Sequence, residues 1–75
     1  MAQPMTAEWI EDVFTYHAPD EEQRGKYERL RAAAKEFAKV LAEETPLCAD
    51  QFAAMRLLRE TVMTANAAIA LKGKV

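Results

Sequence analysis

The feature that most constrains this chain is a run of eleven residues without a charged side chain, from Thr61 to Leu71 (TVMTANAAIAL). A helix that is apolar on every side belongs in a protein interior. The chain has only 75 residues, and a domain of that size gains only about 3–5 kcal/mol from its own core. Most of the interior that encloses this run therefore has to be supplied by something other than the core of this single chain.

The composition excludes the other common ways of stabilising a small domain. Cys48 is the only cysteine, so no disulfide can form within the chain. His17 is the only histidine, so a zinc cluster is not expected, and the sequence indicates no other metal and no cofactor. Association with further copies remains, and we expect a homo-oligomer. The alternative is a three-helix monomer in which the first helix covers part of the apolar surface.

Apolar residues recur at spacings of three and four along the chain, which predicts an all-α fold. The main apolar stripe of the middle helix runs from Tyr27 to Leu41, and that of the last helix runs from Met55 to Ile69. The connection between these helices is short, so we expect an antiparallel two-helix hairpin, preceded by a short N-terminal helix. Within a single domain, 1–75, we predict a tail at 1–5 and helices at 6–16, 20–44 and 46–72.

Residues with a preference for helix ends support these boundaries. Thr6 suits the N-cap of the first helix, and Asp20 with Gln23 three residues later resembles a capping box. Thr45 and Pro46 suit the N-cap and the first position of the third helix.

Charge and hydropathy exclude several classes of partner. The net charge of −2 provides no overall field that would attract nucleic acid, so we expect no DNA partner. No apolar run reaches the roughly 20 residues that a membrane span needs. The segment Met1–Pro4 lacks the basic and apolar regions of a secretory signal, and a lone cysteine is compatible with the cytoplasm.

No motif in the sequence indicates an enzyme. The chain has no glycine-rich phosphate loop, no HExxH and no paired-cysteine motif. Cys48 and His17 would be the only nucleophile–base pair, and their spacing does not support one. A cysteine near the start of a helix is more often a small apolar filler. We therefore expect a protein that is not an enzyme.

The basic residues of the middle helix are more informative. On a helical wheel Arg24, Arg31 and Lys35 fall in a narrow arc at the edge of the apolar stripe. If another subunit packs on the hairpin, this edge becomes the wall of a crevice in which these cations could hold phosphates. The alternative is a solvated face with weak ion pairs, such as one between Glu28 and Arg31.

Two further positions leave alternatives open. Tyr16 and His17 lie at the joint between the first two helices, where their rings could stack on a flat base or could close a corner of the fold. Asn66 lies within the uncharged run, and a buried amide requires hydrogen-bond partners. Asn66 could set the register of an assembly or bind the edge of a ligand.

Three stretches of the chain resemble a known family. Residues 14–19 (FTYHAP) are similar to its N-terminal F-x-Y-H-x-P, and residues 27–35 (YERLRAAAK) to the Y-x-x-x-R-x-x-x-K that opens its first long helix. Residues 62–70 (VMTANAAIA) are similar to its V-M-x-A-N-x-x-I-A. In this order and spacing, the stretches resemble the phage anti-CBASS cyclic-nucleotide sponges and the hairpin domain that these share with an anti-Thoeris sponge.

The resemblance implies a hexamer of helical hairpins that binds cyclic oligonucleotides without cleaving them, in the cytoplasm of an infected bacterium. The ligands it implies are dinucleotides of the cyclic GMP-AMP type and, in some members, cyclic trinucleotides. By motif, Tyr16 would stack on a base with His17 beside it, Arg31 and Lys35 would meet phosphates, and Asn66 would support the assembly.

The chain departs from the family pattern at two places. Thr64 stands where members often carry tryptophan, and Cys48–Asp50 stands where they often carry Ser-Arg-Glu. The missing arginine puts the second ligand class in doubt, and Lys72 is a candidate substitute cation.

Two hypotheses follow from the sequence. The first is a sponge for cyclic nucleotides, which requires an oligomer and local cationic crevices. The second is a helical adaptor whose surplus apolar face binds a host protein. Only the first gives Arg31 a role.

Overall fold

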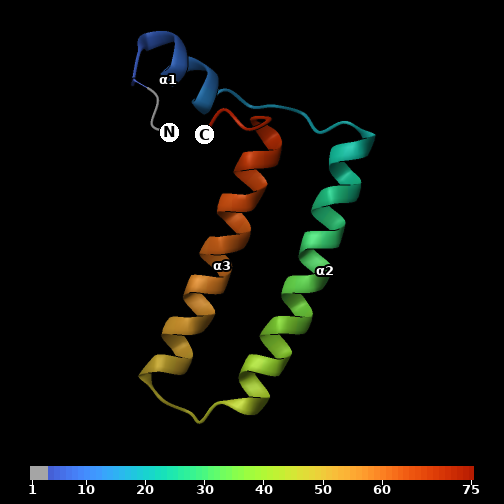
Figure 1. Ribbon diagram of the computed structural model, residues 1–75, viewed down its shortest axis with the longest axis vertical. Coiled ribbons are helices and arrows are strands. Elements are labelled where there is room, and N and C mark those ends of the chain that lie inside the picture. Colours follow the sequence, from blue (N-terminus) through green and yellow to red (C-terminus); the bar gives the residue numbers. More distant parts are fainter. Residues whose placement is uncertain (1–3) are drawn as a thin grey trace.

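A computed structural model describes residues 4–75, and these form three helices and no strand. The helices are α1 (Ala7–Phe14), α2 (Glu21–Glu44) and α3 (Ala49–Ala70). Figure 1 shows α2 and α3 as an antiparallel hairpin, with α1 across its open end beside the C-terminal end of α3. The all-α fold with a short helix before a hairpin is confirmed. Residues 1–3 of the predicted tail, and with them most of the segment Met1–Pro4, lie outside the described residues.

The first two helices begin where their capping residues predict. The hydroxyl oxygen Oγ1 of Thr6 accepts a hydrogen bond from the backbone N–H of Trp9 at 3.1 Å. The carboxylate of Asp20 accepts from the backbone N–H of Gln23 at 2.8 Å, and the side chain of Gln23 accepts from the N–H of Asp20 at 3.0 Å. This reciprocal pair is a complete capping box, which satisfies two backbone donors that a helix start leaves free.

The third helix begins at Ala49, later than the predicted position 46, and its N-cap is Cys48. The reason is that Thr45 serves the preceding helix. Its hydroxyl donates to the carbonyl oxygen of Leu41 at 2.6 Å, and its backbone N–H donates to the same oxygen at 3.2 Å. Thr45 is therefore the C-cap of α2, and Pro46 lies in the connection between the helices.

The other two helix ends also differ from the expected limits. Helix α1 ends at Phe14, and Thr15 follows it in an extended conformation. Helix α3 ends at Ala70, where the backbone turns left-handed at Lys72 (φ 52°) and Gly73 (φ 83°). The backbone N–H of Gly73 donates to the carbonyl oxygen of Ala68 at 3.0 Å and so satisfies one of the carbonyl groups that the helix end leaves free.

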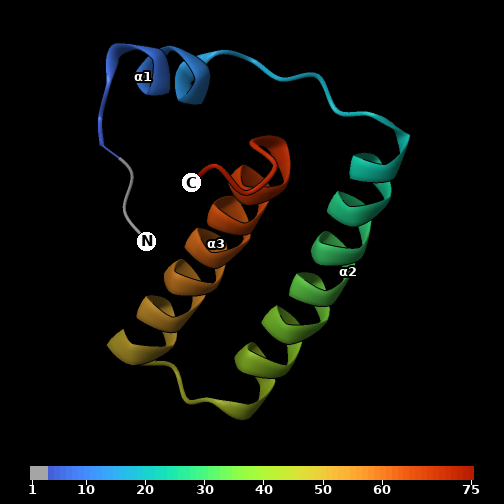
Figure 2. The same cartoon turned by 45° about the horizontal axis from the view of Figure 1, so that its top comes forward.

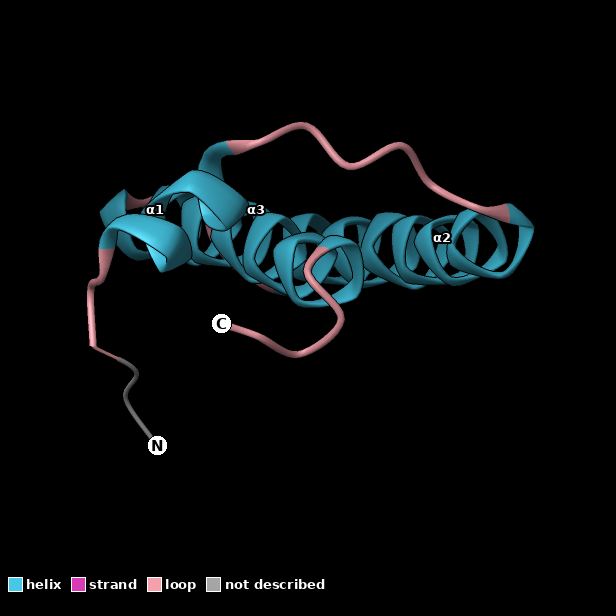
Figure 3. Cartoon of the chain, turned by 90° about the horizontal axis from the view of Figure 1, so that it is seen from above, coloured by secondary structure: helices cyan, strands magenta, loops and turns pink. Residues whose placement is uncertain are grey.

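The protomer is elongated and has almost no core of its own. Among the described residues only Leu41 and Leu71 are buried, at 8% and 7% exposure. The radius of gyration is 15.5 Å, whereas a globular chain of this length has about 11 Å. The view from above shows the reason, because the two long helices form a single layer (Figure 3).

The solvent-exposed surface area also shows that the protomer is far from compact. The chain exposes 6191 Å², whereas a folded monomer of 8.4 kDa exposes about 4,600 Å², so the excess is roughly 1,600 Å². Much of the excess is apolar. Within residues 4–75, eleven large apolar residues are exposed, namely Met5, Ile10, Phe14, Tyr16, Phe37, Val40, Leu47, Phe52, Leu57, Met63 and Val75. No helix within residues 4–75 is long and apolar enough to span a membrane.

Candidate functional site

A trough on one face of the hairpin carries three cations around an apolar floor. Its basic residues are Arg31 and Lys35, one turn apart on α2, and Arg59 on α3. Its volume is about 340 Å³. The apolar residues that line it are Ala34, Ala38, Met55, Leu58, Val62 and Met63. The trough is therefore an apolar depression bordered by positive charge.

The cations of this trough have no carboxylate partner in the described part of the chain. The ion pairs within 4.0 Å all involve other basic residues, and the expected alternative pair between Glu28 and Arg31 is not among them. By contrast, Arg24 pairs with Glu21 at 3.5 Å. An unpaired guanidinium beside apolar surface is ready to bind an anion bidentately, because no internal ion pair has to be broken first.

Arg59 is a member of this trough that the sequence prediction missed. The signal was present, because Arg59 follows Leu58 in the stripe of α3 as Arg31 follows Leu30 in the stripe of α2. A residue next to a stripe position lies at the edge of the apolar face. In an antiparallel pair of helices these two edges face the same side. The grouping of Arg59 with Arg31 therefore follows only once the pairing of the helices is known.

Tyr16 lies outside this trough. It belongs to the linker between α1 and α2, which crosses the open end of the hairpin (Figure 1), and it is 83% exposed. Arg31 lies in the third turn of α2 and lines the trough, whereas Tyr16 is not among the residues that line it. A single chain therefore does not bring together the two residues that the family motifs assign to one ligand.

His17 contacts the end of α1. Its Nε2 donates to the carbonyl oxygen of Asp12 at 2.7 Å and lies 3.7 Å from the carboxylate of the same residue. A carbonyl oxygen only accepts, so this contact requires the proton on Nε2. The ring thus satisfies a backbone acceptor that the end of a helix leaves free. This contact favours the corner-closing interpretation of His17 over stacking on a ligand.

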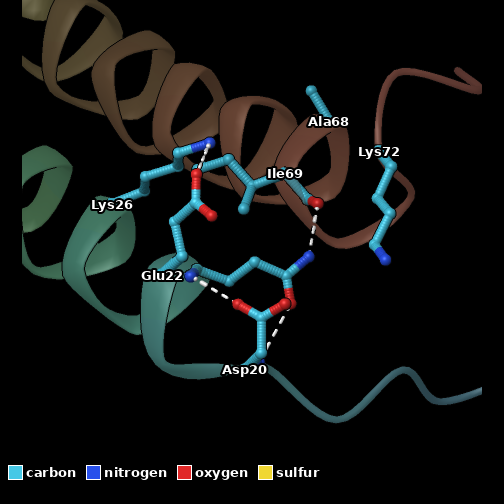
Figure 4. A pocket seen from close by; sticks show the side chains of 7 residues that line it. Asp20, Glu22, Lys26, Ala68, Ile69 and Lys72 are labelled. Carbon is cyan, nitrogen blue, oxygen red and sulfur yellow. Dashed lines mark hydrogen bonds and ion pairs between the residues drawn. The ribbon is translucent and has the colours of Figure 1, made fainter.

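Lys72 lines a second depression, of about 530 Å³, at the open end of the hairpin. Figure 4 shows its side chain apart from the others, whereas Lys26 pairs with Glu22 at 3.4 Å. The side chain of Gln23 donates to the carbonyl oxygen of Ile69 at 2.9 Å and joins α2 to α3 here. The carboxylates of Asp20 and Glu22 make this depression mixed in charge. The trough around Arg31 is the better anion site.

Two buried polar atoms lack a hydrogen-bond partner among the described residues. They are Nε1 of Trp9 and Oδ1 of Asn66. Each unsatisfied group costs about 1–3 kcal/mol. Asn66 therefore still needs a partner, and the assembly-register and ligand-edge interpretations both remain open.

No group of three His, Cys, Asp or Glu side chains that could hold a metal ion occurs within residues 4–75. Cys48 is free and exposed in the connection after α2, whereas His17 lies in the linker at the opposite end of the hairpin (Figure 1). The two side chains therefore do not form a nucleophile–base pair within one chain.

Comparison with known proteins identifies the fold family. The model of the Acb2/Tad1 hairpin domain matches residues 5–70. The chain belongs to this family. No curated protein and no solved structure matches it.

The Acb2/Tad1 match covers all three helices, the linker with Tyr16 and His17, and both α2 cations of the trough, Arg31 and Lys35. Lys72 lies beyond the matched residues. The sponge family identified from three short motifs is thus confirmed over nearly the whole chain.

Proposed function

We propose that this protein binds cyclic oligonucleotide second messengers and sequesters them without cleavage. The observation that carries the proposal is the trough of Arg31, Lys35 and Arg59, whose cations are unpaired within residues 4–75, in a member of the Acb2/Tad1 hairpin family. Dinucleotides of the cyclic GMP-AMP type are the first expected ligands, and cyclic trinucleotides are the second.

The chemistry of the trough suits such a ligand. A cyclic dinucleotide has two phosphates and two flat bases. The guanidinium groups of Arg31 and Arg59 would bind the phosphates through charge-assisted hydrogen bonds, with Lys35 adding a point charge. A base would lie on the apolar floor, and the exposed ring of Tyr16 from a neighbouring copy would cover its other face. Sequestration of this kind requires no catalytic group.

Assembly is part of the proposal. A standard protein–protein interface removes about 800 Å² from each partner. The protomer exposes roughly 1,600 Å² more than a globular monomer of its mass, which is enough for two such interfaces. A chain with two interfaces forms an assembly larger than a dimer, and the hexamer expected from the family resemblance meets this condition. In such an assembly Tyr16 and Arg31 of different copies would meet.

Lys72 is proposed as a contact for the second ligand class. No ion pair holds its side chain in residues 4–75, and it lies at the end of α3 away from the trough. Its mixed surroundings predict weaker binding there than in the trough. We propose that His17 lies near the ligand without binding it directly, because its ring contacts the carbonyl oxygen of Asp12 at the end of α1.

The biological role follows from the ligand. Binding would lower the concentration of the messenger that activates the effectors of bacterial CBASS immunity, so a phage that produces this protein would evade that defence. The site of action would be the cytoplasm of the infected host, where the messenger is made.

Calorimetric titration with cyclic GMP-AMP tests the proposal. We expect binding, and after the complex is heated we expect recovery of intact nucleotide. No binding across a panel of cyclic di- and trinucleotides would refute sequestration. Recovery of a hydrolysed nucleotide would make the protein an enzyme instead.

Arg31→Ala should weaken binding of cyclic GMP-AMP roughly 10- to 150-fold, the range for one lost hydrogen bond to a charged group. Arg56→Ala is the matched control, because Arg56 is exposed on α3 and does not line the trough. Both variants should keep the assembled mass. Equal affinity for Arg31→Ala and the unaltered protein would favour the adaptor hypothesis, in which the exposed apolar face binds a host protein.

A further inference from the structure

The C-terminal tail is joined to α1 by an ion pair. Nζ of Lys74 lies 3.0 Å from Oδ2 of Asp12, although the two residues are 62 positions apart. The other ion pairs in the described residues join neighbours on one helix or adjacent segment. Figures 1 and 2 agree that the C-terminus lies beside α1. This ion pair is therefore a tie between the two ends of the chain.

Asp12 also holds the start of the linker. Its carbonyl oxygen accepts from Nε2 of His17 at 2.7 Å and from the backbone N–H of Thr15 at 3.4 Å. The hydroxyl of Thr15 donates to the carbonyl oxygen of Glu11 at 2.6 Å. Tyr16 lies between Thr15 and His17, so its backbone is fixed on both sides. Its own ring is left exposed.

The far end of the linker is fixed as well, because the capping box of Asp20 anchors it to α2. The position of Tyr16 then depends on where α1 lies. A helix of eight residues is marginal in water and needs tertiary contacts to stay formed. Besides the tie to Lys74, α1 brings Val13 to an apolar depression that also contains Leu71 and Val75. Loss of the tie should loosen α1 and the linker together.

We infer that Asp12 and Lys74 form a clasp that holds α1 on its own hairpin and thereby positions Tyr16. Neither residue touches the trough, and both act through the linker, so they are positioning residues. The consequence for binding rests on the proposed function. A ring that is already ordered loses less conformational freedom when a base stacks on it, which raises affinity without a new contact.

The only tryptophan gives a readout that needs no ligand. Trp9 lies on α1, and its Nε1 is buried. If the clasp holds α1, Lys74→Ala should shift Trp9 emission to longer wavelength and increase its quenching by acrylamide. Lys74→Arg should keep both values at those of the unaltered protein, because arginine retains the positive charge and a side chain long enough to contact Asp12. Lys39→Ala is the matched control, since Lys39 also pairs with a carboxylate, Glu36, but on α2 alone.

Affinity for cyclic GMP-AMP is the second readout. Lys74→Ala and Asp12→Asn should each lower it roughly 2- to 10-fold, the range for the ordering of one side chain, with the assembled mass unchanged. The double variant should lose no more than either single variant, because both break the same contact. Glu11→Gln, on the neighbouring exposed position, should change nothing.

The outcomes separate the clasp from the proposed function. Unchanged Trp9 emission and quenching in both Lys74→Ala and Asp12→Asn would overturn the clasp, whatever the nucleotide does. A changed Trp9 signal with unchanged affinity would overturn the positioning of Tyr16. If the unaltered protein bound no cyclic nucleotide, the proposed function would fail, and the Trp9 signal with its rescue by Lys74→Arg would decide the clasp alone.

Discussion

Replacing Leu57 by glutamate should dissociate the proposed assembly into separate protomers. Leu57 is 55% exposed on α3 and lines a shallow groove with Thr61 and Ala68. These residues belong to a second apolar face of α3, which the hairpin does not cover. A subunit packed on this face would bury Leu57 in the unaltered protein. In the variant it would have to bury a glutamate at the same position.

The size of the effect can be estimated from exposure. Complete burial of a leucine side chain is worth about 1.5–3 kcal/mol. Because Leu57 is 55% exposed in the protomer, its burial on assembly would contribute about half of this free energy, roughly 1–1.5 kcal/mol for each copy. An unpaired carboxylate adds several kcal/mol of desolvation cost. The loss is repeated in every subunit, so a symmetric assembly should not survive it.

Sedimentation velocity over a range of protein concentrations measures this directly, and circular dichroism reports whether the helices persist. Leu57→Met is the control, since a substitution that conserves volume costs less than about 1.5 kcal/mol and should preserve the assembly. An assembled Leu57→Glu variant would mean that this face is not an interface. A monomeric unaltered protein would refute the reasoning from excess surface altogether.

Three further changes test the hairpin itself, each by chemical denaturation at a fixed protein concentration. Gly25→Ala should raise the free energy of unfolding by about 0.5–1 kcal/mol, since the added Cβ would meet only the flexible guanidinium of Arg29, at 3.3 Å; a lower stability would contradict this. Asp20→Ala should cost about 1 kcal/mol by removing the capping box with Gln23, and an unchanged midpoint would mean that the box contributes nothing. Leu41→Ala should cost about 2–5 kcal/mol, because Leu41 is only 8% exposed; a smaller loss would show that its site collapses around the cavity.

The capping residues show what the sequence can predict well. The N-cap of Thr6 and the capping box of Asp20 depend on contacts three residues apart, so the local sequence contains the whole interaction. Thr45 was ambiguous, because its hydroxyl can cap the helix that follows or donate to a carbonyl of the helix that precedes it. The structure uses the second option, with Leu41 as the acceptor. Propensity alone cannot choose between two local hydrogen bonds of this kind.

The site was predictable only in part, for a different reason. Arg31 and Lys35 share one helix face, and periodicity placed them together. Arg59 joins them across the hairpin, and Asp12 meets Lys74 across nearly the whole chain. Neither contact leaves a local pattern, since each depends on how the helices pack. The pairing of Tyr16 with Arg31 is still harder to predict, because the two residues would come from different copies of the chain.

The small number of buried residues has a consequence for how the amount of protein controls its activity. A protomer whose described residues include only Leu41 and Leu71 as buried ones has little stability apart from its neighbours, so dilution should unfold chains as well as separate them. Unassembled chains would be degraded by cellular proteases before they could accumulate. The number of assembled sites would then rise more steeply than the rate of synthesis, with a threshold concentration below which almost none exist.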